Sequence, residues 1–224
     1  MEIIKQAVEE GRKILSEYES KKLLAHYGIP VTREIVVESL DQLKEALNQI
    51  SYPLVLKAHS SEVVHKTEKG LVHVDIRTLE EAESAFQKIL KNLGNQGKAV
   101  LVQEMVKGQR ELVVGLTRDN QFGPCVMFGL GGIFTEILKD VSFRVAPIEK
   151  KDALEMMKEI KAHKILEGIR GMPPADIDLL AQILIKVGKI GLEVEEIKEI
   201  DINPIILHGG SPVAVDALVV LESG

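Results

Sequence analysis

Hydrophobic and polar positions in the first half of the chain alternate between helical and strand periodicities. Apolar residues at helical spacing predict a helix from Ile3 to Leu15 that ends near Ser16. Three more helix starts are predicted by pairs with capping-box spacing: Ser16 with Glu19, Ser39 with Gln42, and Thr78 with Glu81. Strands are predicted between these helices, at residues 33–37, 54–58, 71–76 and 99–105. This alternation over residues 17–105 predicts one α/β lobe layered around a sheet.

The second half of the chain has the spacing of an antiparallel sheet. Strands are predicted at residues 110–117, 124–130 and 143–145, with Asp119 and Asn120 as a turn between the first two. Helices follow at about 150–160 and 176–191, and a hairpin pairs 197–207 with 213–220 across His208, Gly209 and Gly210. We therefore expect an α/β fold of the α+β type with two lobes, at 17–105 and 106–224. The helix within residues 1–16 is expected to pack on the second lobe, and the helix that starts at Ser39 is expected to run to Ile50.

Composition and charge exclude several classes of protein. The net charge is −6 and no block of five or more Lys or Arg occurs, which argues against nucleic acid as a partner. No apolar run approaches 18 residues and the first residues lack a signal-peptide pattern, so we expect a cytoplasmic protein without a membrane partner. The single cysteine, Cys125, excludes an internal disulfide.

Lys57 stands in the apolar segment Leu54–Ala58, where an ammonium group is costly to bury unless an anion meets it. A phosphate group would be a suitable anion. The alternative is a lysine at a strand end that reaches into water. The segment alone does not choose between these interpretations.

His65 lies in a polar loop, with two lysines and a threonine, that ends at Gly70. A neutral imidazole is a good nucleophile near pH 7, and a phosphorylated ring nitrogen can pass its phosphate onward. The alternative is a solvated surface loop whose histidine has no chemical role.

Two further segments are candidates for the wall of a ligand site. Glu104 and Val106 lie at the end of one predicted strand and Glu111 lies near the start of the next, so a crevice between the lobes could hold a nucleotide there. The Gly-rich segment 128–134 matches neither common phosphate-binding fingerprint and could also be a structural turn. Glu136, Asp140 and Arg144 follow at intervals of four, as on a charged helical face or a polar wall.

Alternating acceptors and isoleucines characterise the segment from Glu199 to Asn203. In a strand, Glu199, Asp201 and Asn203 would share one face. If the closing strands pair, Asn203 and Asp216 converge, and their oxygens suit Mg²⁺, which takes few protein ligands. The alternative is a solvated sheet face.

Taken in order, these segments resemble the ATP-grasp fold, and in particular the β subunit of ADP-forming acetyl-CoA (acyl-CoA) synthetases, relatives of succinyl-CoA synthetase. The resemblance spans roughly residues 13–222. It rests on an ordered set of segments: 19–24, 27–31, 53–57, His65-Lys66-Thr67, 102–105, 110–112, 129–132 and 199–204. One departure is that family members commonly carry two adjacent glycines after the His-Lys motif, whereas Leu71 follows Gly70 here.

The resemblance implies roles for individual residues and a nucleotide, ATP or ADP, bound between two lobes. Lys57 would hold phosphates, Glu104 and Val106 would line the adenine site and the hinge, and Glu111 would face the nucleotide. The metal ligands for Mg²⁺ and the residues of the phosphate relay are implied as well: Asn203 and Asp216 for the metal, His65 as the phosphorylated histidine, and Asp201 as the acid beside it.

The family reaction converts acyl-CoA, ADP and phosphate into the free acid, ATP and CoA. The resemblance implies an α subunit that binds CoA and carries a first phosphorylated histidine, in an α2β2-type assembly with this chain. Two alternatives remain at this point. One is an ATP-grasp carboxylate–amine ligase without a histidine relay, and the other is a non-catalytic nucleotide-binding scaffold subunit.

Overall fold

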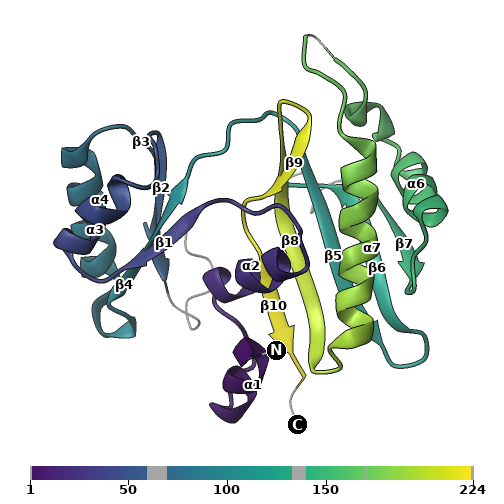
Figure 1. Ribbon diagram of the computed structural model, residues 1–224, viewed down its shortest axis with the longest axis horizontal. Helices are drawn as coiled ribbons and strands as arrows, with labels where there is room; N and C mark the ends of the chain where they lie inside the picture. The colour runs from purple at the N-terminus through teal and green to yellow at the C-terminus, as the bar shows by residue number, and fades with distance from the viewer. Residues whose placement is uncertain (1, 60–69, 133–139, 170, 223–224) are drawn as a thin grey trace. The chain divides into compact units, whose positions relative to one another are not determined.

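The computed structural model describes residues 2–59, 70–132, 140–169 and 171–222, and the chain forms two compact units (Figure 1). The smaller unit contains Ser16–Tyr18 and Thr32–Met105. The larger unit contains Met1–Leu15, Glu19–Val31 and Val106–Gly224. Each unit has its own hydrophobic core.

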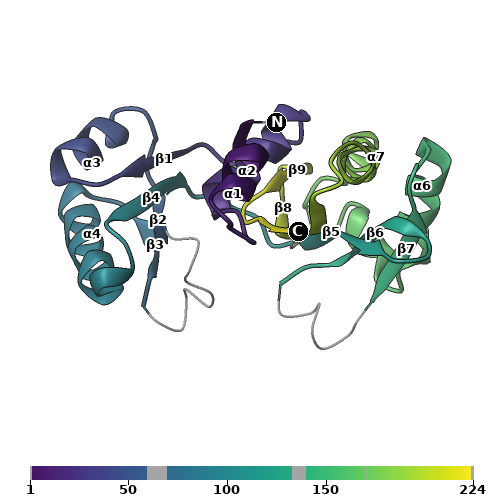
Figure 2. The ribbon, with the colours of Figure 1, turned by 90° about the horizontal axis from the view of Figure 1, so that it is seen from below.

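The smaller unit is built on a four-stranded sheet with the order β1-β4-β2-β3, in which all neighbours are antiparallel. Helices α3 and α4 cover one face of this sheet (Figure 2). Its elements are β1 (Glu34–Val37), α3 (Leu40–Leu47), β2 (Leu54–His59), β3 (Val72–Ile76), α4 (Leu79–Leu93), η1 (Gly94–Gln96) and β4 (Ala99–Glu104). The predicted lobe of helices layered on a sheet is thus confirmed for its strands and helices.

Two of the predicted helix starts are capped as the sequence indicates. The Ser39 side chain accepts a hydrogen bond from the backbone N–H of Gln42, and that of Thr78 accepts one from Glu81. In each helix the third residue reaches back: the Gln42 side chain accepts from the N–H of Glu38 at 2.7 Å. Helix α3 ends at Leu47 rather than Ile50, because the N–H groups of the next residues turn back to carbonyls of the last turn.

The larger unit is built on a six-stranded sheet. Its main path is β10-β8-β5-β6-β7, and β9 pairs with β8. The pairing is antiparallel, as predicted. Helices α6 and α7 cover one face of the sheet, over β5, β6 and β7 (Figure 2). Its elements are α1 (Glu2–Glu9), α2 (Glu17–His26), β5 (Glu111–Asp119), β6 (Gly123–Leu130), β7 (Val141–Val145), α6 (Lys150–Glu159), η2 (His163–Leu166), α7 (Ile177–Glu193), β8 (Ile197–His208), β9 (Ser211–Ala214) and β10 (Leu218–Leu221), although the first residues of α2 group with the smaller unit.

Residues 19–31, which we expect in the first lobe, pack with the larger unit. Leu23 and Leu24 are fully buried in its core, and the chain after α2 continues beside β9, where the N–H of Ala214 donates to the carbonyl of Pro30 at 2.9 Å. Residues 1–15 also pack with the larger unit.

The first helix is shorter than predicted, because α1 ends at Glu9 instead of continuing to Leu15. Gly11 has φ +67, and the N–H groups of Gly11 and Arg12 bond to the carbonyls of Val8 and Ala7. This is the Schellman pattern that glycine favours at the end of a helix. The following residues are extended and lie beside β10, where the N–H of Leu15 donates to the carbonyl of Val219 at 3.0 Å.

The predicted closing strand at 213–220 is split into β9 and β10. Both segments pair with β8, and the interruption at residues 215–217 lies alongside residues 202–204 of β8. Pro204 has no N–H group to donate to a neighbouring strand, so a regular ladder is broken there. The N–H of Val215 still donates to the carbonyl of Pro204 at 3.0 Å.

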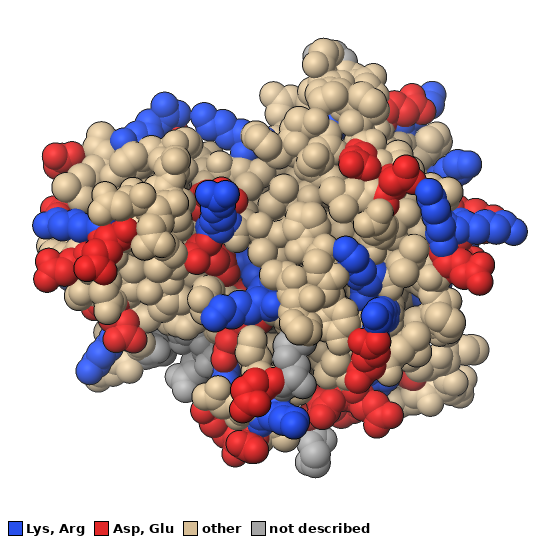
Figure 3. Space-filling view, viewed as in Figure 1, with Lys and Arg blue, Asp and Glu red and all other residues tan. Residues whose placement is uncertain are grey.

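Charged side chains of both signs are interspersed on the face drawn in Figure 3. This agrees with the mixed charge pattern along the sequence. Among the residues that the structure describes, no helix is long and apolar enough to cross a membrane.

Candidate functional site

Strand β8 carries the acceptor residues on one face, as the alternating sequence predicts. Ile200 and Ile202 are almost fully buried in the core of the larger unit, at 1% and 0% exposure. Asp201 and Asn203 point away from that core and are half-buried. The strand therefore presents an amide and a carboxylate on the face that the helices leave open.

Asp216 lies in the interruption between β9 and β10, beside the same stretch of β8. Leu218 pairs with Asp201 and Ala214 pairs with Ile205, so the residues between them run alongside residues 202–204. The Asp216 carboxylate accepts a hydrogen bond from the N–H of Ala217 at 2.8 Å. The predicted convergence of Asp216 with the β8 acceptors follows from this register. We refer to Asp201, Asn203 and Asp216 as the acceptor face.

The acceptor face carries an unfavourable concentration of negative charge. Burial, with smaller contributions from the carboxylates of Glu199 and Asp216, raises the pKa of Asp201 to about 6. A cation would relieve this repulsion. The oxygen donors fit Mg²⁺, which typically takes one or two protein carboxylates and completes its shell with phosphates and waters. Among the described residues no three His, Cys, Asp or Glu side chains converge on a metal position, so a closed, all-protein site is not formed there.

Glu111 begins β5 and lies next to the glycine-rich turn that ends β6. The N–H of Gly131 donates to the carbonyl of Glu111 at 2.9 Å, and the N–H of Gly132 donates to Oδ1 of Asn203 at 2.9 Å. Gly132 has φ +62, and a Cβ atom at this position would collide with the Glu111 carboxylate. The turn therefore links Glu111 to the acceptor face. It is a structural turn that brings the backbone close to Glu111 and Asn203.

Glu104 ends β4 in the smaller unit, and Val106 is the first residue of the following segment of the larger unit. One Glu104 carboxylate oxygen accepts a hydrogen bond from the N–H of Arg33 at 2.8 Å, and the N–H of Glu104 donates to the carbonyl of Arg33. The side chain thus holds the segment that leads into β1. Glu104 and Val106 are both half-buried.

Lys57 is buried in β2, and its ammonium group meets an anion, as the apolar strand requires. The anion is the carboxylate of Glu17, at 2.6 Å from the Lys57 ammonium nitrogen. Glu17 belongs to the same unit as Lys57. The interpretation of Lys57 as a strand-end lysine in water is wrong, because its side chain is only 8% exposed.

Sequence reasoning missed Glu17 and also Lys21, which is 1% exposed. The Lys21 ammonium donates to the carbonyl of Val215 at 3.1 Å, next to Asp216. Helical spacing carried a signal for both, because residues 17, 21 and 24 fall on one stripe of α2 and Leu24 is fully buried. Charged residues on the buried stripe of a helix indicate a specific partner.

Two predicted residues lie outside the part of the chain that the structure describes: His65 and Glu136. The role of His65 therefore stays a prediction.

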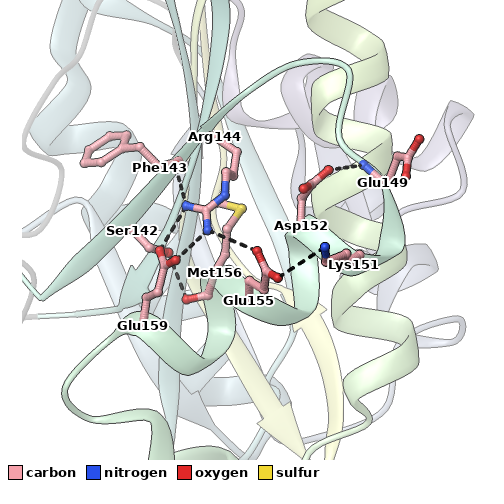
Figure 4. Close-up of polar contacts among 9 residues, drawn as sticks. All are labelled: Ser142, Phe143, Arg144, Glu149, Lys151, Asp152, Glu155, Met156 and Glu159. Carbon is pink, nitrogen blue, oxygen red and sulfur yellow. Dashed lines mark hydrogen bonds and ion pairs between the residues drawn. The ribbon is translucent and has the colours of Figure 1, made fainter.

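Asp140 and Arg144 do not share a helical face, because Arg144 lies in strand β7. The Asp140 carboxylate accepts hydrogen bonds from the N–H groups of Lys161 and Ala162, at 2.7 and 2.8 Å. Arg144 pairs with Glu159 and Glu155 on α6 (Figure 4). Both residues thus fasten α6 and the turn after it to the sheet, and the interpretation as a helical face is wrong for them.

Comparison with known proteins identifies relatives over nearly the whole chain. The family described as ATP-grasp domain matches residues 6–221. The chain is 49% identical to the β subunit of acetate–CoA ligase [ADP-forming] I from Pyrococcus furiosus, over 98% of this chain and 97% of that protein.

Solved structures give the same picture. A dinucleotide-forming acetyl-coenzyme A synthetase 1 from Ca. Korarchaeum cryptofilum, in complex with coenzyme A, Ca-AMPCP and HgCl⁺, matches with a TM-score of 0.95 and 44% identity over 99% of each chain. A second structure of that enzyme, with coenzyme A and Mg-AMPPCP, has its phosphohistidine segment pointing towards the nucleotide-binding site. It matches with a TM-score of 0.89 and 45% identity over 99% of each chain. The predicted ATP-grasp fold is confirmed by these matches.

Proposed function

The chain belongs to the ATP-grasp family and is a relative of the β subunits of ADP-forming acetate–CoA ligases, and from this premise we propose that it is the nucleotide-binding β subunit of such a ligase. The overall reaction is acyl-CoA, ADP and phosphate giving the free acid, ATP and CoA. The observation that carries the proposal is the acceptor face, where Asn203 and Asp216 run side by side next to the turn that holds Glu111. This arrangement supports a site for a metal-bound nucleotide.

The proposal assigns each nucleotide contact to a named residue. Lys57 binds phosphate oxygens, Glu104 and Val106 line the adenine site, and Glu111 faces the nucleotide. Asn203 and Asp216 hold Mg²⁺. When bound, the metal neutralises phosphate charge during transfer.

The phosphate reaches ADP by way of His65. An α subunit that binds CoA and carries its own phosphohistidine passes the phosphoryl group to the His65 imidazole. The phosphorus–nitrogen bond to His65 then breaks as a terminal phosphate oxygen of ADP forms the new phosphorus–oxygen bond. In this proposal Asp201 is the acid that acts on the phosphorylated histidine. A relay is needed because each transfer requires in-line positioning of donor and acceptor.

The partner in this proposal is a subunit of different sequence, in an assembly of two α and two β subunits. Two relatives from Pyrococcus furiosus are β subunits of such ligases, which supports a partner subunit. The mass of the purified assembly tests the stoichiometry.

Replacing His65 with Ala tests the relay in the complete complex. We expect ATP formation from acyl-CoA to fall at least about a thousandfold, because the chain loses its phosphate acceptor. His73→Ala, in β3 of the same unit, is the matched control and should retain the rate. A normal rate in His65→Ala would exclude the relay and favour direct use of an acyl phosphate, as in a carboxylate–amine ligase. Absence of Mg²⁺-dependent ADP binding by the unmodified chain would favour a scaffold subunit.

A further inference from the structure

The Lys57 ammonium group and the Glu17 carboxylate form a buried ion pair within the smaller unit. The side chains are 8% and 4% exposed, and their charged atoms are 2.6 Å apart. By comparison, the side chains of the ion pair between Arg12 and Glu19 are 23% and 24% exposed. Replacing a buried ion pair with apolar residues of similar volume is often neutral or stabilising, so the presence of this pair is weak evidence for a role in stability alone.

Glu17 is held firmly at the end of β2. It is the first residue of α2, and its neighbours Ser16 and Tyr18 group with the smaller unit. Ser16 is 5% exposed, and the Tyr18 ring packs edge-on against the ring of His59, the last residue of β2, with the centroids 6.1 Å apart. The Glu17 carboxylate is thus fixed beside the Lys57 ammonium group and does not meet it by chance.

A carboxylate in contact with a phosphate-binding lysine has two consequences. It lowers the free energy of the buried ammonium group while no nucleotide is bound. The carboxylate also competes with phosphate for the ammonium group. The two anions must share its three N–H donors, and their negative charges repel each other. The first effect stabilises the empty site and the second weakens nucleotide binding.

We propose that Glu17 is a positioning residue that holds the Lys57 ammonium in place and competes with nucleotide phosphate for it, and so sets the nucleotide affinity of the site. This inference rests on the proposed function, in which Lys57 binds phosphate. A subunit that must release ATP in each cycle gains from such a counter-ion, because a lysine without a competitor would hold the product longer.

Replacing Glu17 with Gln tests the competition. Glutamine keeps the size of the side chain and an acceptor oxygen but removes the charge. In the complete complex we expect the Kd for Mg·ADP and for Mg·ATP, measured by calorimetry, to fall about tenfold. In steady state the KM for ADP and kcat should both fall, because release of ATP becomes slower.

Three further variants make the outcome decisive. Glu19→Gln removes the same charge two residues later, where the partner is Arg12, and should leave the nucleotide Kd unchanged. Glu17→Asp shortens the carboxylate and weakens its contact with Lys57, so the Kd should fall by a smaller factor, which gives a second reading if Glu17→Gln folds poorly. Lys57→Met should raise the Kd.

The results separate the inference from the proposed function. If Lys57→Met leaves the Kd unchanged, Lys57 does not bind phosphate, and both the role of Lys57 and the inference fail. If Lys57→Met raises the Kd while Glu17→Gln leaves it unchanged or also raises it, the role of Lys57 stands and the competition by Glu17 is overturned. A merely structural role for Glu17 would lower thermal stability without tightening nucleotide binding.

Discussion

Asp201 shows how a single side chain of the acceptor face is tuned by its surroundings. It is half-buried, it faces Glu199 and Asp216, and its pKa is raised to about 6. Because the ordinary value is 3.8, the folded protein binds a proton at Asp201 more tightly than the unfolded chain does. The metal-free protein should therefore lose stability as the pH rises through the window between these two values.

Replacing Asp201 with Asn removes the charge that causes this loss. At about pH 8, with EDTA present, we expect the variant to be more stable than the unmodified chain by on the order of 1 kcal/mol, because solvent screens part of the effect of the charge. At about pH 3.5, where the carboxyl group is mostly protonated in both states, the two proteins should have similar free energies of unfolding. Urea unfolding at both pH values measures the difference. An equal difference at both pH values would show that the charge of Asp201 is not its cause.

For single residues, the sequence indicated the kind of group each side chain needs better than it indicated which residue supplies that group. The apolar strand around Lys57 left two interpretations open, an anion at its ammonium group or a lysine in water, and the structure has the anion. The identity of that anion was beyond reach, because Glu17 lies 40 residues earlier and only the fold brings the two together. The raised pKa of Asp201 comes chiefly from its burial, with smaller contributions from Glu199 and from Asp216, which lies beside β8 only through the pairing of β8 with β9 and β10.

At the scale of elements, the turn after β6 connects strand β5 to the acceptor face. Gly132 has a positive φ and donates a hydrogen bond to Asn203, and a Cβ atom at this position would collide with the Glu111 carboxylate. Gly123, at the start of the same strand, also has a positive φ, but a Cβ atom there would meet nothing within 4 Å. Substitution of Gly123 would therefore strain only the backbone, whereas substitution of Gly132 would strain the backbone and also disturb Glu111.

Replacing each glycine with Ala tests this distinction. Both variants should lose about 1–2 kcal/mol of stability from the left-handed backbone. Only Gly132→Ala should also displace the Glu111 carboxylate, and we expect it to raise the Kd for Mg·ADP about tenfold, measured by calorimetry. If the two variants have the same Kd for Mg·ADP, the turn at Gly132 does not contribute to the nucleotide site.

Most elements were predictable because their signals are local. The caps at Ser39 and Thr78 and the alternation in β8 correspond to the structure, whereas three boundaries do not: the ends of α1 and α3, and the break between β9 and β10. Gly11 ends α1 early although apolar residues continue at helical spacing, since a left-handed glycine outweighs the pattern. The break between β9 and β10 depends on the neighbouring strand β8, where Pro204 lies alongside the break. Residues 213–220 contain no local signal that predicts it.

At the scale of the whole molecule, the proposed nucleotide-binding residues are divided between the two units. Lys57 and Glu104 belong to the smaller unit, and Glu111, Asn203 and Asp216 belong to the larger one. The ordered set of motifs predicted this fold, which the family match over residues 6–221 confirms. The grouping of residues 19–31 with the larger unit was not predicted, because the burial of Leu23 and Leu24 against that unit's core is a long-range property.

The central claim is that this chain passes phosphate to ADP through His65, and phosphate mapping tests it most directly. The complete complex is incubated with acyl-CoA and phosphate without ADP, digested under mildly alkaline conditions, and searched for acid-labile phosphate. The account predicts phosphate on the peptide that contains His65, and its loss to ATP when Mg·ADP is added. If ATP forms at the normal rate while that peptide never carries phosphate, the claim is contradicted.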